Sequence, residues 1–206
     1  MSAGLPLTPL LLTSGACQFL GFGEESQGAP AAPRGPMVEC FLNEVRAERN
    51  GGKDAPWDAA FVHHVGYWSH FDFRWQRSSW PLPATANVEE LAQYADTSGL
   101  LRLAPLVGDL FLMWSPAKHR FVRVGILLHM DHWINDHALG PCYGCVTIEG
   151  ESRNVTQREG TAVLMQQRWV VPKLGDRFVR WTAADGRDEC WETIQRELDA
   201  KAGRAA

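Results

Sequence analysis

The sequence has no excess of positive charge. Its 206 residues include 20 lysines and arginines against 24 aspartates and glutamates, which gives a formal net charge of −4. The calculated pI is about 6.0. Proteins that bind nucleic acid present a basic face that neutralises phosphate charge. The composition therefore argues against nucleic acid as a partner.

The cysteines are too few and too scattered for a disulfide framework. There are five of them, an odd number without regular spacing: Cys17, Cys40, Cys142, Cys145 and Cys190. Such a set indicates a fold that does not depend on disulfide bonds, and it favours a reducing environment such as the cytoplasm or the interior of a virus particle. Export stays open as an alternative, and no cofactor is predicted.

A long unbroken apolar run is also lacking. The segment 5–22 is apolar and uncharged, but Pro6 and Pro9 interrupt it and no basic residues precede it, so it fits neither a membrane span nor a signal peptide well. Residues 1–35 are rich in Pro, Gly, Ala and Ser and predict an N-terminal arm. The arm is either a disordered tail or a segment that binds a partner through its apolar residues. Residues 36–206 then form one domain.

The first part of that domain has helical periodicity. Val38, Phe41, Leu42 and Val45 share one helical face. A second helix is expected from Pro56 to about Trp68, because proline suits the first turn of a helix. A third is expected from Asn87 to about Ser98, since Asn87 and Glu90 have capping-box spacing and Gly99 follows. A last helix is expected over 188–201.

After Gly99 the pattern changes to short runs of branched and aromatic residues between turn signals. These runs predict strands at 109–114, 121–128, 145–149, 162–171 and 177–181. Helices followed by strands indicate an α+β fold with an antiparallel sheet.

One motif stands out: Pro56-Trp57-Asp58-Ala59-Ala60-Phe61-Val62. It resembles the site helix of the CHAP and NlpC/P60 families of papain-like amidases and peptidases, in which cysteine occupies the position of Asp58. Residues 105–109 resemble the Pro-x-x-Gly-Asp turn of CHAP domains, and residues 147–151 resemble their Thr-Ile-Glu-Gly-Asn segment. The resemblance covers about residues 38–181 and implies a papain-like fold, with N-terminal helices packed on a small antiparallel sheet and a C-terminal helix.

The resemblance also places this chain's residues at the catalytic positions. Asp58 stands at the nucleophile position, Arg123 at the histidine position and Glu151 at the position that orients the histidine. A carboxylate is a poor nucleophile toward an amide, and arginine stays charged at neutral pH and cannot shuttle protons. We therefore expect a catalytically inactive domain, and we expect Asp58 and Arg123 to form an ion pair, with Glu151 as a second acceptor.

Two other groups of residues are candidate sites. An aromatic segment, 67–80, follows the site helix and predicts a binding rim; its aromatic residues are Tyr67, Trp68, Phe71, Phe73, Trp75 and Trp80. Burial of most of these rings in the core is an equally good interpretation. A weak zinc motif lies further on, in residues whose spacing fits no standard zinc finger: His129, His132, His137, Cys142 and Cys145.

Two functions follow as hypotheses. The first is an inactive CHAP-like or NlpC/P60-like domain that serves as a binding or structural component, with a protein partner in a larger assembly or a peptidoglycan peptide as its target. Contact would involve segments 5–22 and 67–80, and membrane contact stays open. The second is an amidase or peptidase with relocated catalytic residues, in which His63, His64 or His70 pairs with Asp58, or Cys40 or Cys142 reaches the cleft.

Overall fold

The structure is a computed structural model that describes residues 9–22, 36–46, 56–74, 76–152 and 162–182. The expected C-terminal helix at 188–201, Trp75 and Cys190 lie outside the described residues. The helices are α1 (Pro9–Cys17), α2 (Pro36–Glu44), α3 (Asp58–Ser69) and α4 (Val88–Thr97), with a short 3-10 turn, η3, at Pro172–Leu174. The strands are β1 (Phe71–Asp72), β2 (Arg77–Ser78), β3 (Leu101–Arg102), β4 (Leu110–Ser115), β5 (Arg120–Asp136), β6 (Gly140–Ser152), β7 (Ala162–Val170) and β8 (Arg177–Val179).

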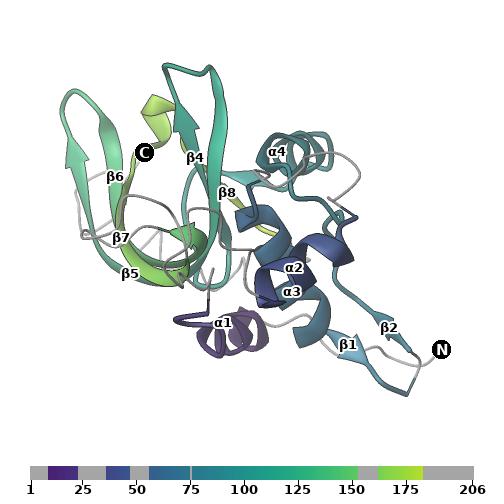
Figure 1. Cartoon of the computed structure of the whole chain (residues 1–206). Helices are drawn as coiled ribbons and strands as arrows, with labels where there is room; N and C mark the ends of the chain where they lie inside the picture. Colours follow the sequence, from purple (N-terminus) through teal and green to yellow (C-terminus); the bar gives the residue numbers. More distant parts are fainter. Residues whose placement is uncertain (1–8, 23–35, 47–55, 75, 153–161, 183–206) are drawn as a thin grey trace, which may run out of the picture.

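Six of the strands form one antiparallel sheet in the order β3-β8-β4-β5-β6-β7, and β1 and β2 form a separate hairpin. The helices lie together on one side of this sheet, and the β1–β2 hairpin projects away from the body of the molecule (Figure 1). The predicted α+β class is confirmed, because helices and an antiparallel sheet occupy successive parts of the chain.

Helix α3 is central to the packing. It contacts α1 and α2 as well as strands β5 and β6. Its buried residues occur around most of its circumference, and they include Ala59, Ala60, Phe61, Val62 and Val65. A helix that is apolar on nearly all sides is expected to lie inside a domain. The first residue of α3 is thereby held deep in the fold.

Helix α4 has the single apolar face that the sequence predicts. Val88, Leu91, Ala92 and Ala95 are buried on it. The Asn87 side chain caps the helix by accepting a hydrogen bond from the Glu89 backbone N–H at 2.9 Å. The Glu90 carboxylate does not complete a capping box: it accepts a hydrogen bond from the Thr85 hydroxyl at 2.6 Å.

The N-terminal segment 9–22 is packed against the domain. Leu12 and Ala16 are fully buried in the main core. The backbone N–H of Gly21 donates to the Val163 carbonyl at 2.9 Å, and the Val163 N–H donates to the Phe22 carbonyl at 2.7 Å. Residues 9–22 therefore contribute apolar side chains to the core of the domain.

Strands β5 and β6 are longer than predicted. The sequence predicts strands at 121–128 and 145–149, whereas pairing of the two strands continues from Ile126 and Ile148 outward to Asp136 and Gly140. Register shifts occur between Leu127 and His129 and between Met130 and His132. Strand pairing is made by backbone groups, so the largely polar side chains at 129–136 gave no strand pattern although their backbone pairs with β6.

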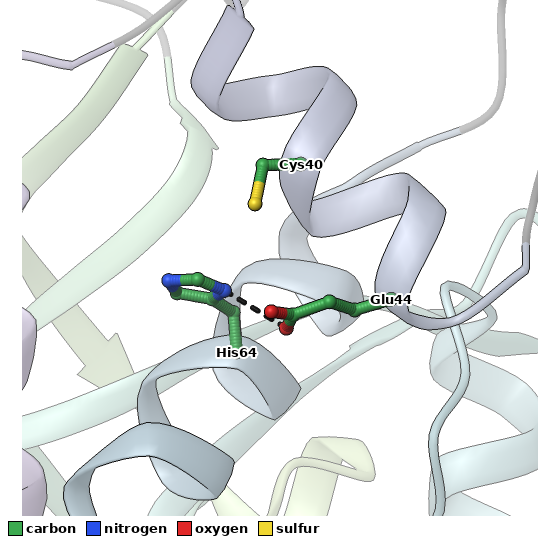
Figure 2. A group of neighbouring side chains, drawn as sticks. All are labelled: Cys40, Glu44 and His64. Carbon is green, nitrogen blue, oxygen red and sulfur yellow. Dashed lines mark hydrogen bonds and ion pairs between the residues drawn. The ribbon is translucent and has the colours of Figure 1, made fainter.

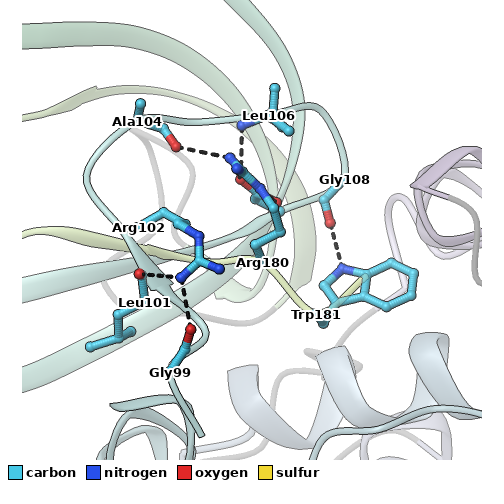
Figure 3. Close-up of polar contacts among 9 residues, drawn as sticks. Gly99, Leu101, Arg102, Ala104, Leu106, Gly108, Arg180 and Trp181 are labelled. Atoms are coloured by element: carbon cyan, nitrogen blue, oxygen red, sulfur yellow. Dashed lines mark hydrogen bonds and ion pairs between the residues drawn. The ribbon is translucent and has the colours of Figure 1, made fainter. Parts of the chain in front are cut away.

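A buried ion pair holds the turn that leads into β4. The Arg180 guanidinium donates to both carboxylate oxygens of Asp109, at 3.3 and 3.1 Å, and to the Ala104 carbonyl at 3.1 Å. The Trp181 indole N–H donates to the Gly108 carbonyl at 2.7 Å (Figure 3). Burial raises the pKa of Asp109 to about 6, against the opposing effect of Arg180. Residues 105–109 are thus fixed by the chain segment that follows β8.

Candidate functional site

Asp58 is the first residue of α3, and its side chain is 1% exposed. Its carboxylate accepts a hydrogen bond from the Ala59 backbone N–H at 3.0 Å and another from the Val124 backbone N–H at 3.2 Å. The first bond uses a free N–H group of the first helical turn, and the second joins the helix to strand β5. The resemblance places the nucleophile at this position.

The surroundings of the Asp58 carboxyl group, taken together, disfavour its charged form. Desolvation raises the pKa of the Asp58 carboxyl from 3.8 to about 7, and the charge of Glu151 adds to the rise. The positive charge of Arg123 and the two backbone N–H donors act in the opposite direction. Burial has the largest effect because the carboxylate is removed from water almost entirely.

Glu151 lies near the end of β6, beside the N-terminus of α3. Its Oε2 accepts a hydrogen bond from the backbone N–H of Trp57, the N-cap residue of α3, at 3.0 Å. A carboxylate at this end of a helix is favoured by the helix dipole and supplies an acceptor for an unpaired N–H. Glu151 thus caps α3, although it lies 94 residues from Trp57 in the sequence.

Arg123 on β5 completes the group, but its contacts differ from those expected. Its Nη1 donates to the backbone carbonyl of Glu151 at 2.8 Å. Among the described residues, no nitrogen of Arg123 lies within 4.0 Å of an Asp58 oxygen, so the expected direct ion pair is absent. The structure does bring Asp58, Arg123 and Glu151 together, through hydrogen bonds to backbone groups.

No histidine of the described residues is hydrogen-bonded to the Asp58 carboxylate. Within the described part of the chain, its hydrogen-bond partners are the N–H groups of Ala59 and Val124. His64 Nδ1 bonds to Glu44, and His70 Nδ1 bonds to the Gly66 carbonyl at 2.9 Å. Burial lowers the pKa of His63, which lines a hollow between α3 and α4 that has no room for a water molecule. None of the three histidines therefore pairs with Asp58.

The aromatic segment divides into an exposed part and a buried part. Tyr67, Trp68, Phe71 and Phe73 form a continuous series of ring contacts with centroids 5.0 to 5.5 Å apart. Trp68 is 45% exposed and Phe73 is 71% exposed. Trp80 differs from the predicted rim role: it is buried, and its ring packs on His70 and Trp181. We call Tyr67, Trp68, Phe71 and Phe73 the aromatic ridge.

The weak zinc motif is not assembled. His129 and His132 are exposed on β5, and Cys142 and Cys145 are buried on β6. The His132 ring packs against Trp169, and Cys145 joins a small apolar cluster on the sheet with Phe111 and Phe178. In the described residues, the only group of three or more potential metal ligands lies elsewhere, so these side chains are not brought together as ligands.

That group consists of Cys40, Glu44 and His64 (Figure 2). Their ligand atoms all lie within 4.8 Å of one another. The sequence interpretation named Cys40 and His64 separately, as possible partners of the cleft, and did not consider Glu44. One signal was available: Cys40 and Glu44 are four residues apart on a predicted helix and therefore share a face.

The chain matches no protein-family model, no curated protein and no solved structure. Within the described parts of the chain, no helix has the length and apolar character needed to cross a membrane. The four described cysteines, Cys17, Cys40, Cys142 and Cys145, are free thiols.

Proposed function

We propose that this chain is a catalytically inactive papain-like domain of the CHAP and NlpC/P60 type, which acts as a binding or structural component of a larger assembly. One observation carries the proposal. Asp58 begins the helix that the resemblance identifies as the site helix, and its carboxylate is bound by the Val124 N–H of β5, the strand that holds Arg123. An active member of these families would have a thiol and an imidazole at these two positions.

The chemistry of the replacements supports inactivity. A nucleophile needs a neighbouring base and access to substrate. Asp58 is 1% exposed and its oxygens are occupied by backbone N–H groups. An arginine side chain is not a general base at neutral pH, so Arg123 cannot take over the role of an imidazole. Glu151 accepts a hydrogen bond from the Trp57 N–H and so caps the helix.

The aromatic ridge supports the binding role. Contiguous exposed aromatic side chains mark contact surfaces, since each buries a large apolar area when a partner covers it. Trp68 and Phe73 are exposed at the end of α3 and on the β1–β2 turn, where the hairpin projects from the body of the molecule (Figure 1). We assign partner contact to this ridge. Of the apolar segment 5–22, Leu12 and Ala16 are already used inside the domain.

A hydrolysis assay tests inactivity. The purified chain is incubated with peptidoglycan-derived peptides, and newly formed amino groups are measured. We expect no turnover above buffer. Turnover that disappears in C40S or H64Q would instead establish the alternative, an amidase or peptidase with relocated residues. Turnover that disappears only in D58N would contradict the assignment of Asp58 as an inactive replacement.

A crosslinking experiment tests the binding role. A photoreactive amino acid is placed at position 73, which is 71% exposed, or at position 165 on β7, where Met165 is 52% exposed. In cells of the source organism, we expect one discrete adduct from position 73 and none of that mass from position 165. Absence of an adduct at position 73, or the same adduct at both positions, would contradict the assignment of the aromatic ridge as the contact surface.

A further inference from the structure

Three side chains with different donor atoms meet where α2 packs on α3. Cys40 and Glu44 project from α2 toward His64 on α3 (Figure 2). His64 Nδ1 lies 2.8 Å from Glu44 Oε2, and the sulfur, nitrogen and oxygen atoms are all within 4.8 Å of one another. The proposed contact surface and the Asp58 site do not use these three residues.

We propose that Cys40, Glu44 and His64 bind one Zn²⁺ ion, with water as the fourth ligand. Thiolate, imidazole and carboxylate are the ligands that zinc takes in proteins, usually in tetrahedral geometry. Bond lengths of about 2.0 to 2.3 Å place tetrahedral ligand atoms about 3.3 to 3.8 Å apart. The observed separations, from 2.8 Å between His64 and Glu44 up to 4.8 Å at most, bracket that range, and the ion would take the place of the proton between His64 and Glu44.

The ligands are already held by neighbouring groups. The Trp68 indole N–H donates to Glu44 Oε1 at 2.6 Å, which leaves Oε2 directed at His64. The His64 ring packs against Phe41, with ring centroids 4.8 Å apart, and against Phe19 at 5.2 Å. Outer contacts of this kind orient metal ligands and raise their affinity.

The same geometry is poorly suited to a cysteine nucleophile. No hydrogen bond joins the Cys40 thiol to His64, although sulfur contacts up to 4.0 Å would count. Burial and the charge of Glu44 raise the pKa of the thiol, whereas a reactive cysteine has a lowered one. Zn²⁺ removes this obstacle because the ion itself displaces the thiol proton and neutralises the adjacent carboxylate.

An ion at this position would fasten α2 to the rest of the fold. Helix α2 has nine residues, and isolated helices of that length are marginal in water. It contributes Val38, Phe41 and Leu42 to the core. A ligand that binds the folded chain alone stabilises it by mass action, so the ion would raise the stability of the whole domain.

The test uses the full chain, stripped with a chelator and then titrated with Zn²⁺ or with Co²⁺ as a spectroscopic substitute. We expect one equivalent to bind and Co²⁺ to give a thiolate charge-transfer band in the near ultraviolet. At a Zn²⁺ concentration a hundredfold above Kd, the thermal midpoint should rise by about 5 to 10 °C. C40S should abolish the band, and E44Q and H64Q should weaken binding at least about tenfold.

C17S is the matched control, because Cys17 is a free, exposed thiol on α1 outside the cluster, and it should behave as the unmodified chain. Far-ultraviolet circular dichroism checks that each variant is folded, and E44Q tests the site without removing the thiol or the imidazole. The proposal is overturned if the folded wild-type chain gives neither the band nor the thermal shift. It is also overturned if the band survives in C40S, or if E44Q binds as tightly as the unmodified chain.

Discussion

The Asp58 carboxylate and the Val124 backbone N–H are joined by a 3.2 Å hydrogen bond across 66 residues of sequence. This bond ties the first residue of α3 to strand β5, inside the core and out of reach of solvent. A charged carboxylate in such a position is costly unless its partners compensate for lost hydration. Its protonation state should therefore be linked to the stability of the fold.

The stability of the domain should fall as pH rises from about 4 to about 7. The pKa of Asp58 is raised from 3.8 to about 7 in the folded chain. Between these values the folded chain keeps a proton that the unfolded chain has released, so the free energy of unfolding decreases with pH by up to about 1.4 kcal/mol per pH unit. Urea unfolding of the unmodified chain and of D58N across this range measures the difference. A difference that does not change with pH would contradict the raised pKa.

Arg123 should limit the rise in the pKa of Asp58. Its positive charge lowers the pKa of Asp58, against the effect of burial. Replacing it in R123Q should raise the pKa of Asp58 further, so that the loss of stability continues to higher pH. R123K keeps the charge and serves as the matched control, with a profile close to that of the unmodified chain. Carboxyl chemical shifts of Asp58, followed by NMR during a pH titration, report the change directly, and equal midpoints in R123Q and R123K would exclude a role for the charge.

The Asp109–Arg180 pair should be important for folding. Both side chains are buried, and D109A would leave the Arg180 guanidinium without its carboxylate partner. Breaking a buried pair in this way costs about 3 to 5 kcal/mol. The exposed pair between His129 and Asp131, with a 3.5 Å separation, is the control, and D131N should cost less than about 1 kcal/mol. Chemical denaturation of the two variants should show this order, and equal losses would contradict it.

Two aromatic residues of segment 67–80 should behave in opposite ways. Trp80 is 9% exposed and Phe73 is 71% exposed. W80A should lower the free energy of unfolding by about 3 to 5 kcal/mol, because it leaves a cavity beside His70 and Trp181. F73S should change it by less than about 0.5 kcal/mol. Unfolding midpoints compare the two, and a large loss in F73S would assign the aromatic ridge to the core.

The sequence alone predicted the parts of the fold that local pattern controls. Val38, Phe41 and Leu42 repeat at helical spacing and are buried on α2, and the apolar face of α4 lies where its spacing indicates. The strands β4, β7 and β8 were also predicted close to their observed bounds. The capping residue Asn87 was predicted from its capping-box spacing with Glu90; its side chain does cap the helix, although Glu90 bonds to Thr85 instead.

Only the tertiary structure decided which distant residues meet. Apolar residues of α1 are packed in the core, a contact that the local composition did not predict. Arg123 donates to the Glu151 backbone carbonyl, 28 residues away in the sequence, and not to the Asp58 carboxylate. Cys40 and Glu44 meet His64 because α2 packs on α3, a contact that depends on apolar burial over both helices and leaves no local trace in the sequence.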